Sequence, residues 1–284
     1  MPNVNSHIVL ITGAGYRAPK GWTANPLTDE GVKLNIGAAV AIRAATLGYR
    51  IAIAGRRPQI VDSLFAGLAA RFPSQALACA AFDVTNECSV ANFVQSLPTD
   101  DGIDLVQSVG LSSGHYEVKD DNPYACIEDL NPSIMTAELT TPIMALVASV
   151  RALLPIWMKR PPSRAIIVNS MSAVRAYRRG VSHASSKGAL HQAVRSLCLE
   201  LYSRNVFLSE INPGIVDTGL YDRESVKLAV RDIAASFGQD LSGKDLPAMS
   251  PEAVADAAMF ALTSASHIVQ VNMVASGQFP NLGA

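Results

Sequence analysis

The chain has 284 residues, of which 49% are hydrophobic and 17% are charged, and its formal net charge is −1. This length can bury one large core, and the balanced charge leaves no basic face for nucleic acid or for an anionic membrane. We therefore expect one globular domain over residues 1–284 that acts on a small neutral or modestly charged molecule.

The cysteine spacing and the apolar stretches argue against a metal site, a signal peptide and a membrane span. The four cysteines show neither CxxC spacing nor the spacing of metal ligands, so we expect no metal site. The first residues run into an apolar strand pattern without the segments of a signal peptide. The most apolar stretch, 142–158, is interrupted by Arg151 and Pro155 and is shorter than the roughly 20 residues of a membrane span. We expect a cytoplasmic protein without a membrane segment.

Short β-branched runs alternate with longer helical patterns along the chain. The strand candidates are 7–12, 50–54, 76–82, 103–109, 164–169, 206–212 and 268–272. The helix candidates are 36–47, 59–72, 90–97, 137–154 and 182–204. Strands separated by such helices predict βαβ units, and hence a doubly wound α/β domain. We expect a seven-stranded, mostly parallel sheet with helices on both faces. Residues 221–250 are the least regular, and they are interpreted either as a substrate lid or as a surface excursion.

Two glycine-containing segments follow the first strand candidate. Thr12-Gly13-Ala14-Gly15 ends the strand, and Asn35-Ile36-Gly37 starts the next helix. Glycines let the backbone approach a phosphate closely, and a helix N-terminus presents free N–H groups to it. This pair of segments predicts a nucleotide-binding turn.

An insertion, residues 16–34, separates these two segments. Its side chains include Tyr16, Arg17, Lys20, Trp22, Asp29 and Lys33. One hypothesis is that the insertion folds over a cofactor, with Arg17 or Lys20 contacting it. The alternative is a solvated excursion that the fold tolerates.

Two arginines follow the second strand candidate, in the segment Gly55-Arg56-Arg57. In a dinucleotide-binding fold an acidic residue at this point binds the ribose 2′-hydroxyl, whereas arginine favours a 2′-phosphate. Arg56 and Arg57 therefore predict NADP(H) as the cofactor. The alternative is that they only end a strand.

The order of these motifs resembles the short-chain dehydrogenase/reductase family, from about residue 8 to residue 272. Thr12, Gly13 and Gly37 match the TGxxxGxG turn of that family, and Asn35 replaces the middle glycine. The resemblance implies a Rossmann-type fold, an NADP(H)-dependent reaction, and a homodimer or homotetramer.

The resemblance also implies a set of cofactor contacts. Phe82-Asp83-Val84-Thr85 resembles the adenine-contacting Asp-Val, and Asn212–Thr218 resembles the PG-x-V-x-T segment that closes over the nicotinamide. Gly110 ends a segment that reads Gln-Ser-Val-Gly where the family has Asn-Asn-Ala-Gly. The predicted cofactor-binding residues are Thr12, Gly13, Gly15, Asn35, Ile36, Gly37, Arg56, Arg57, Asp83, Val84, Gly110, Lys187, Pro213, Gly214, Ile215 and Thr218.

The catalytic segment departs from the family pattern. The family uses Ser, Tyr and Lys, with Tyr-x-x-x-Lys on one helix so that both side chains share a face. Here His183 stands at the tyrosine position, four residues before Lys187. The serine is Ser172 by its distance from the preceding strand, which we prefer, or Ser170 by its distance from His183.

His183 has two interpretations, a neutral hydrogen-bond donor to the substrate or a structural histidine of a packed helix. The ammonium of Lys187 disfavours an imidazolium there. Tyr177 is a further candidate for the missing phenol, although it precedes the helix. The helix asparagine of the family is also missing, with Glu138 or Pro142 near its place, and His191 is expected on a packed helix face.

Two functions fit these residues. The first is an NADPH-dependent reductase of a C=O or C=N group in a small organic molecule, with Ser172 or Ser170, His183 and Lys187 as catalytic residues. The second is a cofactor-binding relative that has lost hydride transfer and has a non-redox or binding role. Retained Arg56 and Arg57 fit both, whereas the missing tyrosine favours the second.

Overall fold

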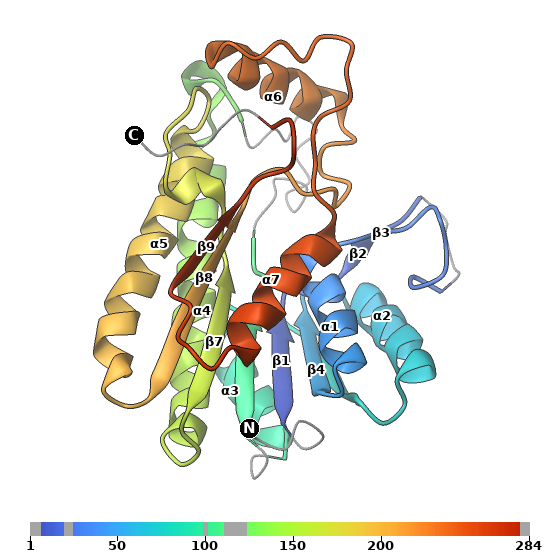
Figure 1. Cartoon of the computed structure of the whole chain (residues 1–284), viewed down its shortest axis with the longest axis vertical. Coiled ribbons are helices and arrows are strands. Elements are labelled where there is room, and N and C mark those ends of the chain that lie inside the picture. Colours follow the sequence, from blue (N-terminus) through green and yellow to red (C-terminus); the bar gives the residue numbers. More distant parts are fainter. Residues whose placement is uncertain (1–6, 20–24, 99–101, 111–123, 279–284) are drawn as a thin grey trace.

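The computed structural model describes residues 7–19, 25–98, 102–110 and 124–278 (Figure 1). Its centre is a seven-stranded sheet in the order β5-β4-β1-β6-β7-β8-β9, in which all neighbouring strands are parallel. The strands are β1 (Ile8–Thr12), β4 (Arg50–Gly55), β5 (Ala76–Ala81), β6 (Ile103–Gln107), β7 (Ser163–Val168), β8 (Val206–Pro213) and β9 (Gln270–Met273). The predicted α/β fold is confirmed.

The helices cover both faces of this sheet (Figure 1). They are α1 (Ile36–Thr46), α2 (Pro58–Arg71), α3 (Glu87–Ser96), α4 (Pro132–Trp157), α5 (Val181–Tyr202), α6 (Glu224–Ser236) and α7 (Pro251–Thr263). Residues of α1, α2 and α7 pack with one face of the sheet, and residues of α3, α4 and α5 pack with the other. Strand β1 shows why both cores form, because Val9 and Ile11 enter the first core whereas Ile8 and Leu10 enter the second.

Helix α4 is long and apolar enough, by length and composition, to cross a membrane. In this structure its Leu146, Leu153 and Trp157 are fully buried in the second core. The indole Nε1 of Trp157 donates a hydrogen bond to the carbonyl of Ile103 at 2.7 Å. These contacts make α4 a core helix of the α/β domain.

The strand order changes direction between β1 and β6, which places a crevice at the carboxyl ends of the strands. The chain builds β1, β4 and β5 outward and then returns to β6 on the other side of β1. Parallel α/β sheets bind ligands at such a reversal. We therefore expect the functional site at the carboxyl ends of β1, β4, β6, β7 and β8.

Residues 221–250, which the sequence left irregular, contain helix α6. One side of α6 supplies Val226, Val230 and Ile233 to a third, small core that also includes Tyr124 and Ile215. Helix α6 lies beyond the carboxyl edge of the sheet (Figure 1). It forms a wall beside the crevice.

Candidate active site

Two adjoining cavities, of about 240 Å³ and about 610 Å³, follow the carboxyl ends of the strands. The residues that line both of them are Asn35, Arg57, Ile60, Ser108, Val109 and Gly110. We call the two cavities together the groove.

Most predicted cofactor residues line the groove. The smaller of its two cavities has Gly13, Gly15, Arg56, Asp83 and Val84, and the larger has Ile36, Lys187, Pro213, Gly214 and Thr218. The remaining predicted residues, Thr12, Gly37 and Ile215, do not line it. Thr12 is buried in β1, and a side chain at Gly37 would come within 2.8 Å of the carbonyl of Gly13. Gly37 therefore allows close packing of the turn, and its contact with a cofactor stays a prediction.

Asn35 organises the turn at the start of α1. Its Oδ1 accepts hydrogen bonds from the N–H groups of Gly15 at 3.0 Å and Ala38 at 2.9 Å. Its Nδ2 donates to the carbonyl of Gly13 at 2.8 Å. This N-cap occupies two backbone donors of the turn, so a phosphate bound here needs other donors.

The insertion forms a short antiparallel hairpin of β2 (Tyr16–Arg17) and β3 (Lys33–Leu34). It projects beside α2 (Figure 1). Arg17 donates to the carbonyl of Gly219 at 3.1 Å, and Lys33 Nζ lies 2.7 Å from Asp217 and 2.9 Å from Asp222. The hairpin thus contacts the segment that follows β8, across the mouth of the groove. The predicted contact residue Lys20 lies outside the described residues, as does Trp22 of the insertion.

Three arginines gather at this mouth. Arg17, Arg57 and Arg223 line the larger cavity of the groove, and Arg56 lines the smaller one. Burial, followed by the charges of Arg223 and Arg57, lowers the pKa of Arg17. Like charges held this close favour the binding of a multiply charged anion.

The two candidate serines follow β7. Ser170 caps a 3₁₀ turn, η4 (Met171–Ala173), by accepting a hydrogen bond from the N–H of Ser172 at 3.1 Å. The hydroxyl oxygens of Ser170 and Ser172 are 3.1 Å apart, and that of Ser172 lies 3.1 Å from the hydroxyl of Tyr177. The three hydroxyls form a chain.

A third cavity, of about 60 Å³, adjoins these hydroxyls, and we call it the small cavity. Ser170, Gly214 and Tyr221 line both the groove and the small cavity. Ser172 and Tyr177 line only the small cavity. Ser170 is therefore at the junction between the two spaces, and Ser172 is one step further from the groove.

Helix α5 presents His183 and Lys187 to the groove, one turn apart. Burial and the ammonium of Lys187 lower the pKa of His183 to about 3, so its imidazole is neutral at pH 7. The His183 ring also packs edge-on against Tyr124, with the ring centroids 5.9 Å apart. A neutral ring can donate an N–H but cannot deliver an imidazolium proton.

Burial lowers the pKa of Lys187 to about 8, although the charges of Glu138 and Glu210 oppose this shift. Glu138, on α4, is buried and accepts a hydrogen bond from the hydroxyl of Ser182. Its backbone carbonyl accepts another from Ser186. Glu138, which lies near the place of the missing family asparagine, therefore joins α4 to the part of α5 that carries His183 and Lys187.

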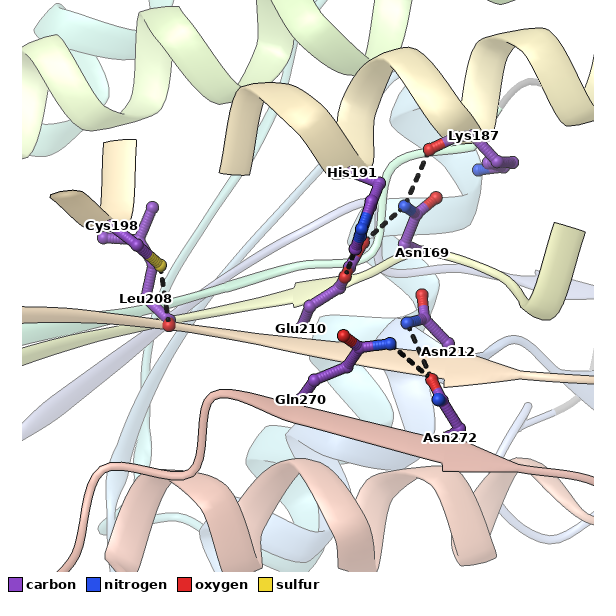
Figure 2. A network of polar contacts seen from close by, with 9 residues as sticks. All are labelled: Asn169, Lys187, His191, Cys198, Leu208, Glu210, Asn212, Gln270 and Asn272. Atoms are coloured by element: carbon purple, nitrogen blue, oxygen red, sulfur yellow. Dashed lines mark hydrogen bonds and ion pairs between the residues drawn. The ribbon is translucent and has the colours of Figure 1, made fainter. Parts of the chain in front are cut away.

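A second buried carboxylate supports α5 from the sheet side (Figure 2). Asn169 Nδ2 donates to the backbone carbonyl of Lys187 at 3.0 Å and to Glu210 Oε1 at 2.6 Å. His191 Nδ1 lies 2.6 Å from Glu210 Oε2. His191 thus packs inward, and the network fixes the backbone at Lys187.

We expect Glu210→Ala to lower the free energy of unfolding by about 2–4 kcal/mol, because it removes one of the two acceptors of the buried Asn169 Nδ2 and the partner of the half-buried His191 Nδ1. Urea denaturation measures this loss. Glu200→Ala, at an exposed position of helix α5, is the control and should change stability by less than about 0.5 kcal/mol. A loss for Glu210→Ala no larger than for the control would contradict this role.

Comparison with known proteins identifies the family. A model of the family described as short chain dehydrogenase matches residues 31–229. The chain is 26% identical over 242 residues to the "NADP-dependent 3-hydroxy acid dehydrogenase" of Schizosaccharomyces pombe, which covers 84% of this chain and 87% of the relative.

Solved structures share the fold. An NADPH-bound short chain oxidoreductase from Pseudomonas aeruginosa PAO1, described as containing an atypical catalytic center, has a TM-score of 0.71 and 18% identity, covering 96% of this chain and 97% of that one. The alcohol dehydrogenase of the archaeon Thermococcus sibiricus, complexed with 5-hydroxy-NADP, has a TM-score of 0.69 and 19% identity, covering 96% and 98%. Because the family model spans more than half of the sequence, this chain belongs to the short-chain dehydrogenase/reductase family.

Proposed function

We propose that the protein is an NADP(H)-dependent oxidoreductase that reduces a C=O or C=N group of a small organic molecule. The observation that carries this proposal is the junction at Ser170, where a basic groove that holds Lys187 meets the small cavity. The NADP-dependent relative from S. pombe and the two structures with NADPH or 5-hydroxy-NADP support the choice of cofactor.

The residues of the groove fit NADP(H). Arg56 and Arg57 stand at the end of β4, where the 2′-phosphate of an adenosine ribose is bound in this type of fold. Arg17 and Arg223 supply further positive charge beside Asn35, which has used the donors of the turn. The cluster therefore compensates for the missing middle glycine.

The chemistry divides between the cofactor and the chain. When bound, the reduced nicotinamide supplies a hydride to the substrate carbon. Ser170 or Ser172 donates a hydrogen bond to the substrate oxygen or nitrogen, and neutral His183 donates to the same atom. Lys187 orients the nicotinamide ribose and supplies the positive field that stabilises the developing negative charge. The proton reaches the product through water, through the hydroxyl chain that ends at Tyr177, or with an iminium substrate that already carries it.

The direct experiment mixes purified protein and NADPH with a panel of ketones, aldehydes and imines. Loss of the NADPH absorbance with any member of the panel supports the proposal. If NADPH binds but no member is reduced, the protein is a cofactor-binding relative with a non-redox or binding role. In that case turnover of the Lys187 and serine variants gives no information, and their effect on the binding of small-molecule ligands is measured instead.

We expect Arg56→Ala and Arg57→Ala to weaken NADPH binding by about 10- to 100-fold, because each removes a charge-assisted contact with the 2′-phosphate. NADH lacks that phosphate, so its affinity should change by less than about threefold. Calorimetric titration with both cofactors measures this difference. Arg43→Ala is the control, because Arg43 pairs with Asp256. Equal losses for the two cofactors would contradict the assignment.

We expect His183→Ala to lower ketone reduction by about 10²–10³-fold, which is the usual loss when a positioned hydrogen-bond donor to a developing oxyanion is removed. Iminium reduction should be spared because the substrate brings its own proton. His183→Tyr restores the residue of the family and should raise carbonyl reduction. Initial rates of NADPH consumption test both variants, and identical rates in all three proteins would assign His183 to structure alone.

A further inference from the structure

The polar side chains that line the small cavity can all donate hydrogen bonds. Its described lining residues are Tyr124, Ser170, Met171, Ser172, Arg175, Tyr177, Gly214, Ile215, Tyr221, Val230, Ile233 and Gln278. Among these, Arg175 is the one residue with a formal charge, and none is a carboxylate. The other polar groups are hydroxyls and one amide, which can all donate hydrogen bonds.

The guanidinium of Arg175 is stacked on an aromatic ring. It lies 4.3 Å above the centre of the Phe237 ring, at the end of α6. Stacking on an aromatic ring orients the planar donor fork and reduces the entropy lost when it binds a ligand. A guanidinium oriented in this way matches the two oxygens of a carboxylate.

Gln278 supplies a second oriented donor. Its Oε1 accepts hydrogen bonds from the N–H groups of Ile215 at 3.1 Å and Ala275 at 3.4 Å. The carbonyl end of the amide is therefore occupied, and its Nε2 is the end that can donate to a ligand. A Cβ at Gly214 would come within 2.6 Å of this Nε2, so glycine makes room for the amide.

We propose that the small cavity binds the carboxylate of an oxo acid or of the related hydroxy or imino acid, with Arg175 as the carboxylate-binding residue. This inference rests on the proposed function, because it places the reacting C=O or C=N group at Ser170 and Ser172. Arg175 and the serines line one cavity of about 60 Å³, so the acid and the reacting group are only a few bonds apart. The substrate is therefore a short-chain acid.

The test compares each acid with its uncharged ester. The probes are pyruvate against methyl pyruvate and acetoacetate against methyl acetoacetate, each with NADPH. We expect the parent protein to prefer at least one acid to its ester in kcat/KM. Arg175→Gln should lower kcat/KM for that acid by about 10- to 100-fold and change it for the ester by less than about threefold. Arg175→Lys should restore part of the preference.

Arg178→Gln is the matched control, since Arg178 is exposed and lies 3.4 Å from Asp232. It should leave the preference unchanged. If the parent reduces acid and ester equally well, or if Arg175→Gln weakens both equally, the inference is wrong while the reductase proposal stands.

If neither these probes nor the ketones, aldehydes and imines of the wider panel consume NADPH, the proposed function fails, and calorimetric titration with butanoate still tests Arg175. Butanoate should bind the parent and Arg178→Gln, with about 10-fold weaker binding to Arg175→Gln or none. Equal binding to all three proteins, or no binding to the parent, would overturn the assignment.

Discussion

Replacing Lys187 by Met should lower kcat/KM for both ketone and iminium substrates by about 10²–10⁴-fold, the usual loss for a positioned group of the catalytic step. In the proposed mechanism Lys187, unlike His183, acts on every substrate, because it orients the ribose and supplies charge. Methionine keeps the length and burial of the side chain and removes only the ammonium. Initial rates with NADPH measure the loss, and calorimetry shows whether the cofactor still binds.

The same variant has a pH signature. Burial lowers the pKa of Lys187 to about 8, so the ammonium of the parent protein is lost as the pH rises through that value. We expect the parent rate to fall above about pH 8 and the residual rate of Lys187→Met not to show this step. Lys159→Met, at an exposed position, is the control and should keep both rate and profile. A Lys187→Met rate equal to that of the parent would exclude this role.

The sheet could be predicted from sequence because its strands are nearly continuous apolar runs. All five residues of β1 and four of the six residues of β4 are buried, which is typical of parallel strands covered on both faces. The ends of these strands carry the glycine and proline segments that line the groove. The glycine and proline segments at the strand ends therefore predict the groove from local sequence alone.

Helix α6 and the β2–β3 hairpin could not be predicted in the same way. The hairpin strands have two residues each, too few for a period-two pattern. Helix α6 packs against a small third core and not against the main sheet, so the βαβ pattern of the sequence does not predict its position. Val230 and Ile233 of α6 line the small cavity together with Tyr177, and this contact depends on the tertiary fold.

The site itself was predicted in part. Spacing located Lys187 and His183 on one helix face, which the structure shows directly at the groove. The partners of these residues come from distant elements, Glu138 from α4 and Glu210 from β8, and spacing along the chain gives no signal for them. The choice between Ser170 and Ser172 stays a prediction, with Ser170 nearer to the groove.

Removing the two charges of the hairpin, in Arg17→Ala/Lys33→Ala, should weaken NADPH binding by about 100-fold. Arg17 lines the groove beside Arg57 and Arg223, and its loss removes positive charge from the proposed phosphate site. The carboxylates of Asp217 and Asp222 raise the pKa of Lys33, which keeps it charged. Without Lys33 these two carboxylates repel the phosphates at the mouth of the groove. Loss of the Arg17 contact costs about 1.5–3 kcal/mol, and the screened repulsion by the two exposed carboxylates adds up to about 1 kcal/mol, which together give about 100-fold.

A shortened hairpin separates these contacts from the bulk of the insertion. Arg17 and Lys33 are paired in register, so an Asn-Gly turn can replace residues 18–32 and close a two-residue hairpin. We expect this shortened protein to bind NADPH within about threefold of the parent, because it keeps both charges that reach across the groove. Calorimetric titration at two salt concentrations measures all three proteins, and the double variant should lose the most salt dependence. If the double variant binds NADPH as tightly as the parent, the insertion is a solvated excursion. If the shortened protein binds as weakly as the double variant, the contacts lie within residues 18–32 instead of at Arg17 and Lys33.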